Sequence, residues 1–266
     1  MALDLITPRI PLLDAKHYDE DSVFTAENMI RAARRQKQMT ATPVPDICVL
    51  DPDGDLLRYA QRHGAPVCAG WACYHTQMVV LDHGGRRFGI IGNAVGSAFA
   101  VLLAEQVFAS GCQLLISLTS AGRIDATGAG PYFMLIDRAL RDEGTSYHYL
   151  PPSRYAHAPA DLIGKIIQAA EAAGVNLNVG ASWTTDAPFR ETQSAIEAAR
   201  AEGILAVEME AAALYAFAAA RGERVICLAQ ITNEMGQIEG DFEKGQENGA
   251  IDALNLLGLV AGSVQP

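Results

Sequence analysis

Residues 203–217, Gly-Ile-Leu-Ala-Val-Glu-Met-Glu-Ala-Ala-Ala-Leu-Tyr-Ala-Phe, constrain the fold more than any other stretch of the chain. The apolar run 204–207 predicts a short buried strand, and the alanine-rich run after it predicts a buried helix that ends near residue 221. Glu208 and Glu210 lie at the junction. The first turn of a helix tolerates acidic side chains, because unpaired N–H groups and the positive end of the dipole face them. The pair is therefore either an ordinary helix start, or one glutamate points into a ligand site and accepts hydrogen bonds from two neighbouring hydroxyl groups.

Similar apolar runs recur and alternate with helical patterns. The predicted strands cover residues 47–50, 77–81, 88–91, 114–118, 175–182, 204–207 and 225–231. The predicted helices cover residues 26–38, a stretch from 56, one that ends near 109, then 160–173, 208–221 and 242–261. This alternation predicts an α/β fold, a single domain with a central mixed β-sheet flanked by helices. We expect an N-terminal arm and short helix over residues 1–45 and the α/β domain over 46–266, with residues 131–158 left unplaced.

Charge and cysteine usage exclude several classes of protein. The net charge of −11 and the pI near 4.9 argue against a general nucleic-acid binder, which needs a basic excess to neutralise phosphates. The five cysteines form no CxxC pair and no zinc-spaced cluster, so we expect buried free thiols and no metal. The N-terminus lacks the pattern of a signal peptide, and no apolar run approaches a membrane span. These features predict a soluble, cytoplasmic protein.

The first predicted strand runs into a glycine turn, Asp51-Pro52-Asp53-Gly54-Asp55, and then into a helix. Strand, glycine turn and helix is an arrangement that aims backbone N–H groups at an anion. One glycine is a weak signal, because most such turns bind nothing.

The segment Val207-Glu208-Met209-Glu210-Ala211 resembles the ribose-binding segment of the nucleoside phosphorylase superfamily. That superfamily includes hexameric purine nucleoside phosphorylases, uridine phosphorylases and methylthioadenosine nucleosidases. The resemblance implies that Met209 packs beneath the sugar and that Glu210 binds its 2′- and 3′-hydroxyls. Weaker matches follow in the same chain order, from about residue 47 to residue 235.

The resemblance also implies a phosphate site. Gly54-Asp55-Leu56-Leu57-Arg58 is similar to the phosphate-binding Gly-Asp-Pro-x-Arg turn, which assigns Gly54 and Arg58 to phosphate. The loop expected after strand 114–118 adds Ser120, with Thr119 beside it. Hexameric phosphorylases have an arginine three residues before that hydroxyl, whereas this chain has Ser117, and a charge-assisted hydrogen bond is worth roughly 1.5–3 kcal/mol. Either another arginine replaces it (Arg123, Arg86, Arg87 or one from a partner chain), or phosphate is not the acceptor, as in the methylthioadenosine nucleosidases, which use water.

Two further stretches resemble base-binding segments of the family. Phe189 is the candidate for stacking on the nucleobase, and Arg190 is a candidate donor to a base carbonyl or, equally, a helix-start residue paired with an acid. Asn233 stands where family members hold the leaving base. Because an asparagine can donate a hydrogen bond but cannot supply a proton, it favours a 6-oxopurine or a pyrimidine over adenine.

These residues predict cleavage of an N-glycosidic bond, with Glu210 and Asn233 as the catalytic pair. The first hypothesis is a nucleoside phosphorylase that converts nucleoside and phosphate to free base and ribose 1-phosphate. The second is a nucleosidase in which Asp53 or Asp55 activates water, and the third is a nucleoside-binding protein without turnover. No cofactor is expected beyond phosphate as co-substrate. The resemblance also implies a homo-oligomer built from dimers (a dimer or a hexamer), with His17 and His75 as candidates for side chains lent to a neighbouring site.

Overall fold

The computed structural model describes residues 10–125, 131–233, 242 and 244–264. The strands are β1 (Ile47–Asp51), β2 (Val79–His83), β3 (Arg86–Gly92), β4 (Leu114–Arg123), β5 (Tyr132–Asp142), β6 (Tyr155–His157), β7 (Asn178–Thr185), β8 (Ile204–Glu208) and β9 (Val225–Asn233). The α-helices are α1 (Ala26–Gln36), α2 (Asp55–Arg62), α3 (Ser97–Phe108), α4 (Ala160–Ala172), α5 (Gln193–Ala201), α6 (Ala211–Arg221) and α7 (Ala250–Val264). Short 3-10 turns lie at Ser146–His148, Pro188–Arg190 and Gln246–Gly249. The predicted α/β class with a mixed sheet and flanking helices is confirmed.

Part of the sheet closes on itself, which the sequence did not predict. β4 pairs with β9, β9 with β5, β5 with β7, β7 with β8, and β8 returns to β4. From this ring of five strands, β1, β3 and β2 extend outward from β4, and β6 pairs with β5. The previously unplaced region 131–158 supplies β5, which completes the ring, and β6.

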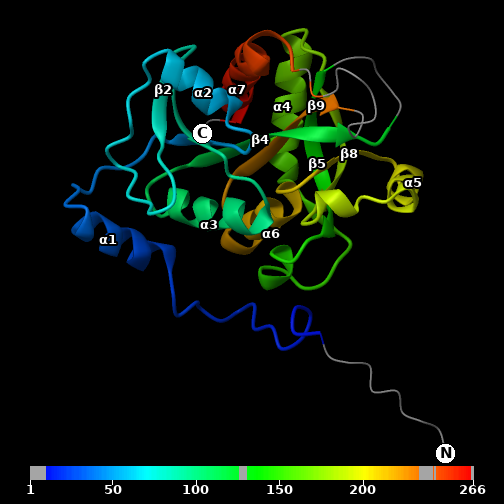
Figure 1. The fold of residues 1–266 in the computed structure, drawn as a ribbon, viewed down its shortest axis with the longest axis horizontal. Coiled ribbons are helices and arrows are strands. Elements are labelled where there is room, and N and C mark those ends of the chain that lie inside the picture. Colours follow the sequence, from blue (N-terminus) through cyan, green and yellow to red (C-terminus); the bar gives the residue numbers. More distant parts are fainter. Residues whose placement is uncertain (1–9, 126–130, 234–241, 243, 265–266) are drawn as a thin grey trace, which may run out of the picture.

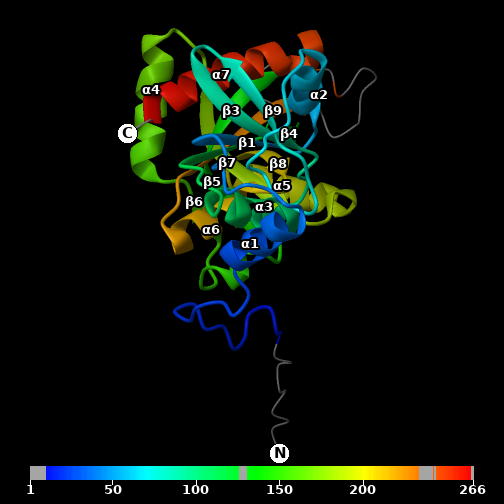
Figure 2. The ribbon, with the colours of Figure 1, turned by 90° about the vertical axis from the view of Figure 1, so that its left-hand side faces the viewer.

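Two layers of helices cover the strands on opposite sides (Figures 1 and 2). α3 and α6 pack on one side over buried side chains such as Leu115 of β4, and α2, α4 and α7 pack on the other over Leu114 and Ile116. Successive residues of a strand point to opposite faces, so β4 contributes to both cores. The side chains of β4 thus contribute to the hydrophobic cores on both sides of the sheet.

The N-terminal helix α1 is amphipathic and lies against the α3 side of the domain (Figure 1). Thr25 caps it by accepting a hydrogen bond from the Asn28 N–H, and Ile30 and Ala33 are buried with Ala72. The segment before it, from residue 10, contains no helix or strand, while residues 1–9 of the predicted arm lie outside the described residues. The proposed division between residues 45 and 46 stays a prediction.

The expected state of the cysteines is confirmed. All five cysteines are buried free thiols. Within the described ranges, no helix has the length and hydrophobicity needed to cross a membrane.

Candidate active site

The candidate site lies where strand β4 changes neighbours. β1 pairs with β4 as far as Ser117, and β8 pairs with it only from Gly122, while β9 runs alongside from Leu115 to Gly122. Residues 118–121 therefore have one edge to which no described strand pairs. Ligands of α/β sheets bind at such switch points, because the diverging neighbours leave a crevice.

Thr119 and Ser120 sit inside β4, which corrects the expectation that they lie in a loop after the strand. The strand continues to Arg123 because β9 pairs with it across this stretch, with one irregularity between Ala121 and Gly122. The phosphate role expected for Thr119 and Ser120 stays a prediction.

The turn after β1 is held by Asp51. Its buried carboxylate accepts hydrogen bonds from the N–H groups of Gly54 (3.1 Å) and Leu57 (2.8 Å), so Asp51 itself takes the first donors of α2. Burial raises the pKa of Asp51 to about 7. Gly54 has φ +74°, and a Cβ atom there would lie 2.5 Å from the Asn93 side chain and 2.8 Å from that of Arg58. Only glycine fits this turn.

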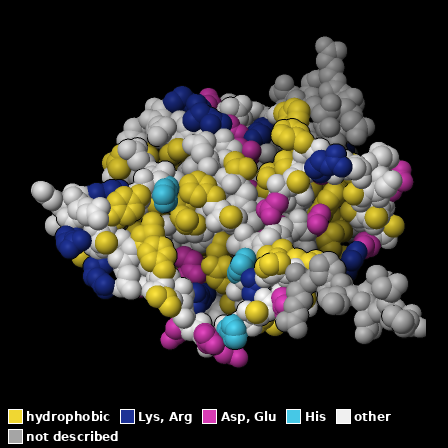
Figure 3. Space-filling model, turned by 60° about the horizontal axis from the view of Figure 1, so that its bottom comes forward, with side chains coloured by type: hydrophobic (Ala, Val, Ile, Leu, Met, Phe, Trp, Pro, Cys, Tyr) yellow, Lys and Arg dark blue, Asp and Glu magenta, His cyan; other side chains and the backbone are white. Residues whose placement is uncertain are grey.

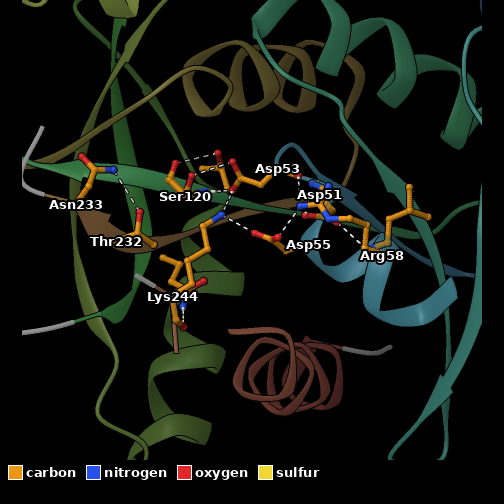
Figure 4. Close-up of polar contacts among 12 residues, drawn as sticks. Asp51, Asp53, Asp55, Arg58, Ser120, Thr232, Asn233 and Lys244 are labelled. Carbon is orange, nitrogen blue, oxygen red and sulfur yellow. Dashed lines mark hydrogen bonds and ion pairs between the residues drawn. The ribbon is translucent and has the colours of Figure 1, made fainter. Parts of the chain in front are cut away.

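A polar network joins this turn to β4 (Figure 4). The Asp53 carboxylate accepts hydrogen bonds from the Ser120 N–H (2.8 Å) and from the Ser120 hydroxyl (2.9 Å). Lys244 Nζ lies 3.2 Å from Asp53 and 2.6 Å from Asp55. Arg58 donates to the Asp55 carboxylate (2.5 Å) and to the Asp53 carbonyl oxygen (3.0 Å). The predicted phosphate residues Ser120 and Arg58 are thus brought close together, and carboxylates occupy their donors.

Lys244 is the functional candidate that sequence reasoning missed. Burial lowers the pKa of Lys244, but the charges of Asp53 and Asp55 outweigh burial and raise the pKa above its ordinary value. Lysine here is a half-buried cation beside the predicted anion site, although it comes from the segment before α7, which carries no motif. Its carbonyl oxygen accepts from the Gln230 amide (3.0 Å), which ties that segment to β9.

The arginines proposed to replace the one missing at position 117 have different outcomes. Arg86 and Arg87 begin β3, whereas the site adjoins Gly92 at its other end, about 17 Å away for five residues of strand. Arg87 pairs there with Asp82. These two cannot reach the site in this chain. Arg123 is the last residue of β4, one residue after Gly122, and so lies at the end of β4 that adjoins the site.

The two glutamates at the β8–α6 junction have different environments. Glu208 is buried and accepts four hydrogen bonds, from the hydroxyls of Ser182 and Thr184 and the N–H groups of Glu210 and Ala211. Glu208 therefore has a structural role and holds the junction.

Glu210 is also buried, and its two carboxylate oxygens have different surroundings within the described part of the chain. Oε1 accepts a hydrogen bond from the Gly96 N–H (2.7 Å), whereas Oε2 has no hydrogen-bond partner among the described residues. Burial and the nearby charge of Glu208 raise the pKa of Glu210 to about 8. Beside it, the Met209 carbonyl oxygen accepts from the Ser97 hydroxyl (2.8 Å), which fastens the segment to the start of α3. A buried carboxylate oxygen without a donor is costly and is suited to a ligand hydroxyl.

The predicted base-binding residues come from the end of β9 and from the turn after β7, two strands that both pair with β5. Asn233 ends β9 opposite Gly122 of β4, and its amide donates to the Thr232 hydroxyl (3.3 Å; Figure 4). Phe189 and Arg190 lie in the 3-10 turn that follows β7, next to the β8 end that carries Glu208. Phe189 is 99% exposed and contributes nothing to the core, so its side chain is available to a ligand. All these ligand roles stay predictions.

A small cavity adjoins the polar network. It has a volume of about 20 Å³, room for one water molecule, and its lining includes Asp51, Asp53, Asp55, Ser120 and Lys244. Three carboxylates and one lysine thus face the same space.

A sequence model described as phosphorylase superfamily matches residues 49–264. A guanosine phosphorylase from Halorubrum lacusprofundi is 23% identical over 174 residues, which cover 65% of this chain and 69% of that protein. A uridine phosphorylase from Thermococcus kodakarensis is 24% identical over 240 residues, which cover 78% and 84% of the two chains. A DeoD-type purine nucleoside phosphorylase from Roseobacter denitrificans is 26% identical over 163 residues, and the match spans 65% of its length, slightly under two thirds.

Among solved structures, the crystal structure of uridine phosphorylase from Vibrio fischeri matches with a TM-score of 0.68 at 19% identity, and the match covers 85% of this chain and 94% of that one. The similarity shows a shared fold. The range matched by the family model includes the turn after β1, strand β4 and the Glu208–Ala211 junction, and the chain belongs to the phosphorylase superfamily.

Proposed function

We propose that this protein cleaves the N-glycosidic bond of a nucleoside by phosphorolysis and releases a free base and ribose 1-phosphate. The observation that carries the proposal is Glu210, whose buried Oε2 atom lacks a donor within the described part of the chain. The 2′- and 3′-hydroxyls of a ribose are two neighbouring donors, and their spacing matches the spacing of the two oxygens of one carboxylate. The family membership and the phosphorylases among the relatives support phosphate as the acceptor.

In the proposed reaction, a phosphate oxygen attacks C1′ while the bond from C1′ to the base nitrogen breaks. The electron pair of that bond leaves with the base, and positive charge builds on the ribosyl ring in the transition state. Glu210 fixes the ring by its hydroxyls and so holds C1′ near the acceptor. The Ser120 N–H and hydroxyl, with Arg58 and Lys244 close by, provide the donors and cations for an anion.

The base is proposed to be a 6-oxopurine or uracil. Asn233 can donate a hydrogen bond from its amide to a base carbonyl or ring nitrogen as negative charge develops there. Phe189 is proposed to stack on the base, and Arg190 to donate to a carbonyl. The names of the guanosine and uridine phosphorylases among the relatives agree with a base that carries such a carbonyl.

Hydrolysis is the second candidate, and two observations favour it. Ser117, at the position of the family arginine, is 1% exposed and carries no charge. The one-water cavity lies beside Asp53 and Asp55. Burial raises the pKa of Asp55, but hydrogen bonds and charge from Lys244 and Arg58 outweigh burial and lower it, which makes Asp55 a weaker general base.

A substrate panel tests the proposal. Uridine, thymidine, inosine, guanosine, adenosine and methylthioadenosine are incubated with and without phosphate, and base release is followed by chromatography. Phosphorolysis requires that base release depends on phosphate and yields ribose 1-phosphate from uridine, inosine or guanosine. Equal release of free ribose without phosphate would instead establish the nucleosidase, and absence of release would leave a binding protein.

We also propose that the protein is a homo-oligomer. Hydrophobic side chains gather on the face that carries α1 and α3 (Figure 3). The exposed ones on these elements and the adjoining loops include Phe24 (73% exposed), Val95 (52%), Tyr74 and Leu102. His75 packs edge-on against Phe99 of α3, so this candidate for a lent side chain lies on the same side. A second copy of the chain is the proposed partner.

A further inference from the structure

The Ser120 donors form an anion-binding site that already holds an anion. The backbone N–H and the hydroxyl of this residue converge on the two oxygens of the Asp53 carboxylate, at 2.8 and 2.9 Å. The N–H is available because β4 has no strand partner on that edge between Ser117 and Gly122 in the described structure. A carboxylate and a phosphate group both present oxygens that can accept hydrogen bonds from two converging donors of this kind.

Charge around the donors disfavours a second anion while Asp53 is in place. Asp53 and Asp55 face Lys244 and Arg58, so the two carboxylates already neutralise the two cations. Asp51 lies in the same turn and lines the same cavity. Inorganic phosphate that enters would lose both Ser120 donors to Asp53 and would meet a like charge within contact distance.

Asp53 is nevertheless positioned to move. It lies in the turn between β1 and α2, immediately before Gly54, and its side chain is 31% exposed. Arg58 holds the Asp53 backbone through the carbonyl oxygen, so rotation of the side chain would leave the turn intact. The cation that pairs with the carboxylate, Lys244, would then face the vacated donors.

We propose that Asp53 is an internal competitor of the acceptor anion and sets how tightly phosphate binds. The inference rests on the proposed phosphate-dependent function, since it concerns the same subsite. Removal of the Asp53 carboxylate frees two donors and one cation for phosphate. Even one charge-assisted hydrogen bond recovered by phosphate corresponds to about a tenfold gain in affinity.

The test is the dissociation constant of inorganic phosphate, measured by calorimetry on the free protein without nucleoside. Asp53→Ala is expected to bind phosphate at least about tenfold more tightly than the wild type, and Asp53→Asn, which keeps one acceptor oxygen, to show a smaller gain. Asp82→Ala is the matched control, because it also removes one negative charge but lies in the β2–β3 hairpin, where Asp82 pairs with Arg87. The gain in phosphate affinity should be smaller in the double variant Asp53→Ala/Ser120→Ala, because the Ser120 hydroxyl that Asp53 releases is then missing.

Unchanged or weaker phosphate binding in a folded Asp53→Ala or Asp53→Asn protein would overturn the inference, as would an equal gain in Asp82→Ala. Asp53→Asn keeps the size of the side chain and serves if the alanine variant does not fold. Failure of the proposed function is recognised separately. Base release by the wild type that ignores phosphate would refute phosphorolysis, whereas the competition between Asp53 and phosphate is decided by binding alone.

Discussion

Replacement of Glu210 by glutamine tests the sugar-binding role most directly. The side chain is 2% exposed, one oxygen is held by the Gly96 N–H, and the other has no partner among the described residues. Glutamine has nearly the same shape, but its amide nitrogen cannot accept a hydrogen bond and it carries no charge. The change therefore removes one acceptor oxygen and the negative charge, and it leaves the packing almost unaltered.

The size of the effect follows from the two hydroxyls that one carboxylate can bind. A hydrogen bond to a charged group is worth about 1.5–3 kcal/mol, and glutamine retains one neutral acceptor. We expect kcat/KM for a ribonucleoside to fall about 10- to 150-fold, because each 1.36 kcal/mol is about a factor of ten in rate. For the 2′-deoxynucleoside, which has lost one of the two donors already, the same substitution should cost less.

The assay is steady-state base release at several nucleoside concentrations, for both sugars and both proteins. Glu197→Gln is the control, since Glu197 is an exposed α5 residue that accepts a hydrogen bond from the Gln193 amide, and the change removes the same charge. A thermal melt verifies that the variants are folded. If Glu210→Gln retained full activity, or lost the same factor on both sugars, Glu210 would not bind the diol.

Further predictions concern pH, the base and assembly. The folded protein holds protons on Asp51 (pKa about 7) and Glu210 (pKa about 8) that the unfolded chain releases above about pH 4, so stability falls as the pH rises from about 4 to about 8. The melting temperature should therefore be lower at pH 8.5 than at pH 5.5, and a flat profile would contradict this. Asn233→Asp should lower base release from inosine or uridine and raise it from adenosine, compared in the same substrate panel; a uniform loss would mean that Asn233 does not select the base. Leu102→Glu on the α3 face should reduce the mass measured by light scattering, whereas Val175→Glu, exposed after α4, should not; a monomeric wild type would rule out the oligomer.

Local signals predicted most of the elements, and long-range pairing explains what they missed. The strands predicted near β2 and β3, the strand that begins at Ile47 and the β8–α6 junction all appear where the hydrophobic pattern placed them, within a few residues. The closed ring was not predictable, because it depends on β5, whose burial does not alternate regularly and whose pairing with β7 shifts between Ile136 and Arg138.

The site shows the same division. Gly54, Ser120, Glu210 and Asn233 could be predicted as candidates from their motifs, and the structure brings the turn at Gly54 and Ser120 into one polar network. Lys244 had no such signal, because its importance arises only when the chain before α7 folds back against Asp53 and Asp55. That Asp53 binds Ser120 was equally invisible, since 67 residues separate them in sequence.

The stretch of β4 without a strand partner on one edge, residues 118–121, has a consequence for how the site of this chain can diverge. A backbone N–H cannot be removed by substitution of its own side chain, except by proline, so any sequence that keeps this strand order inherits the Ser120 donor. Selection can then act only on the acceptor that binds this N–H, which can be a substrate oxygen, a water molecule or an acidic side chain from the turn after β1. In the competition proposed for Asp53, the residue at position 53 therefore decides which of these acceptors the Ser120 N–H binds.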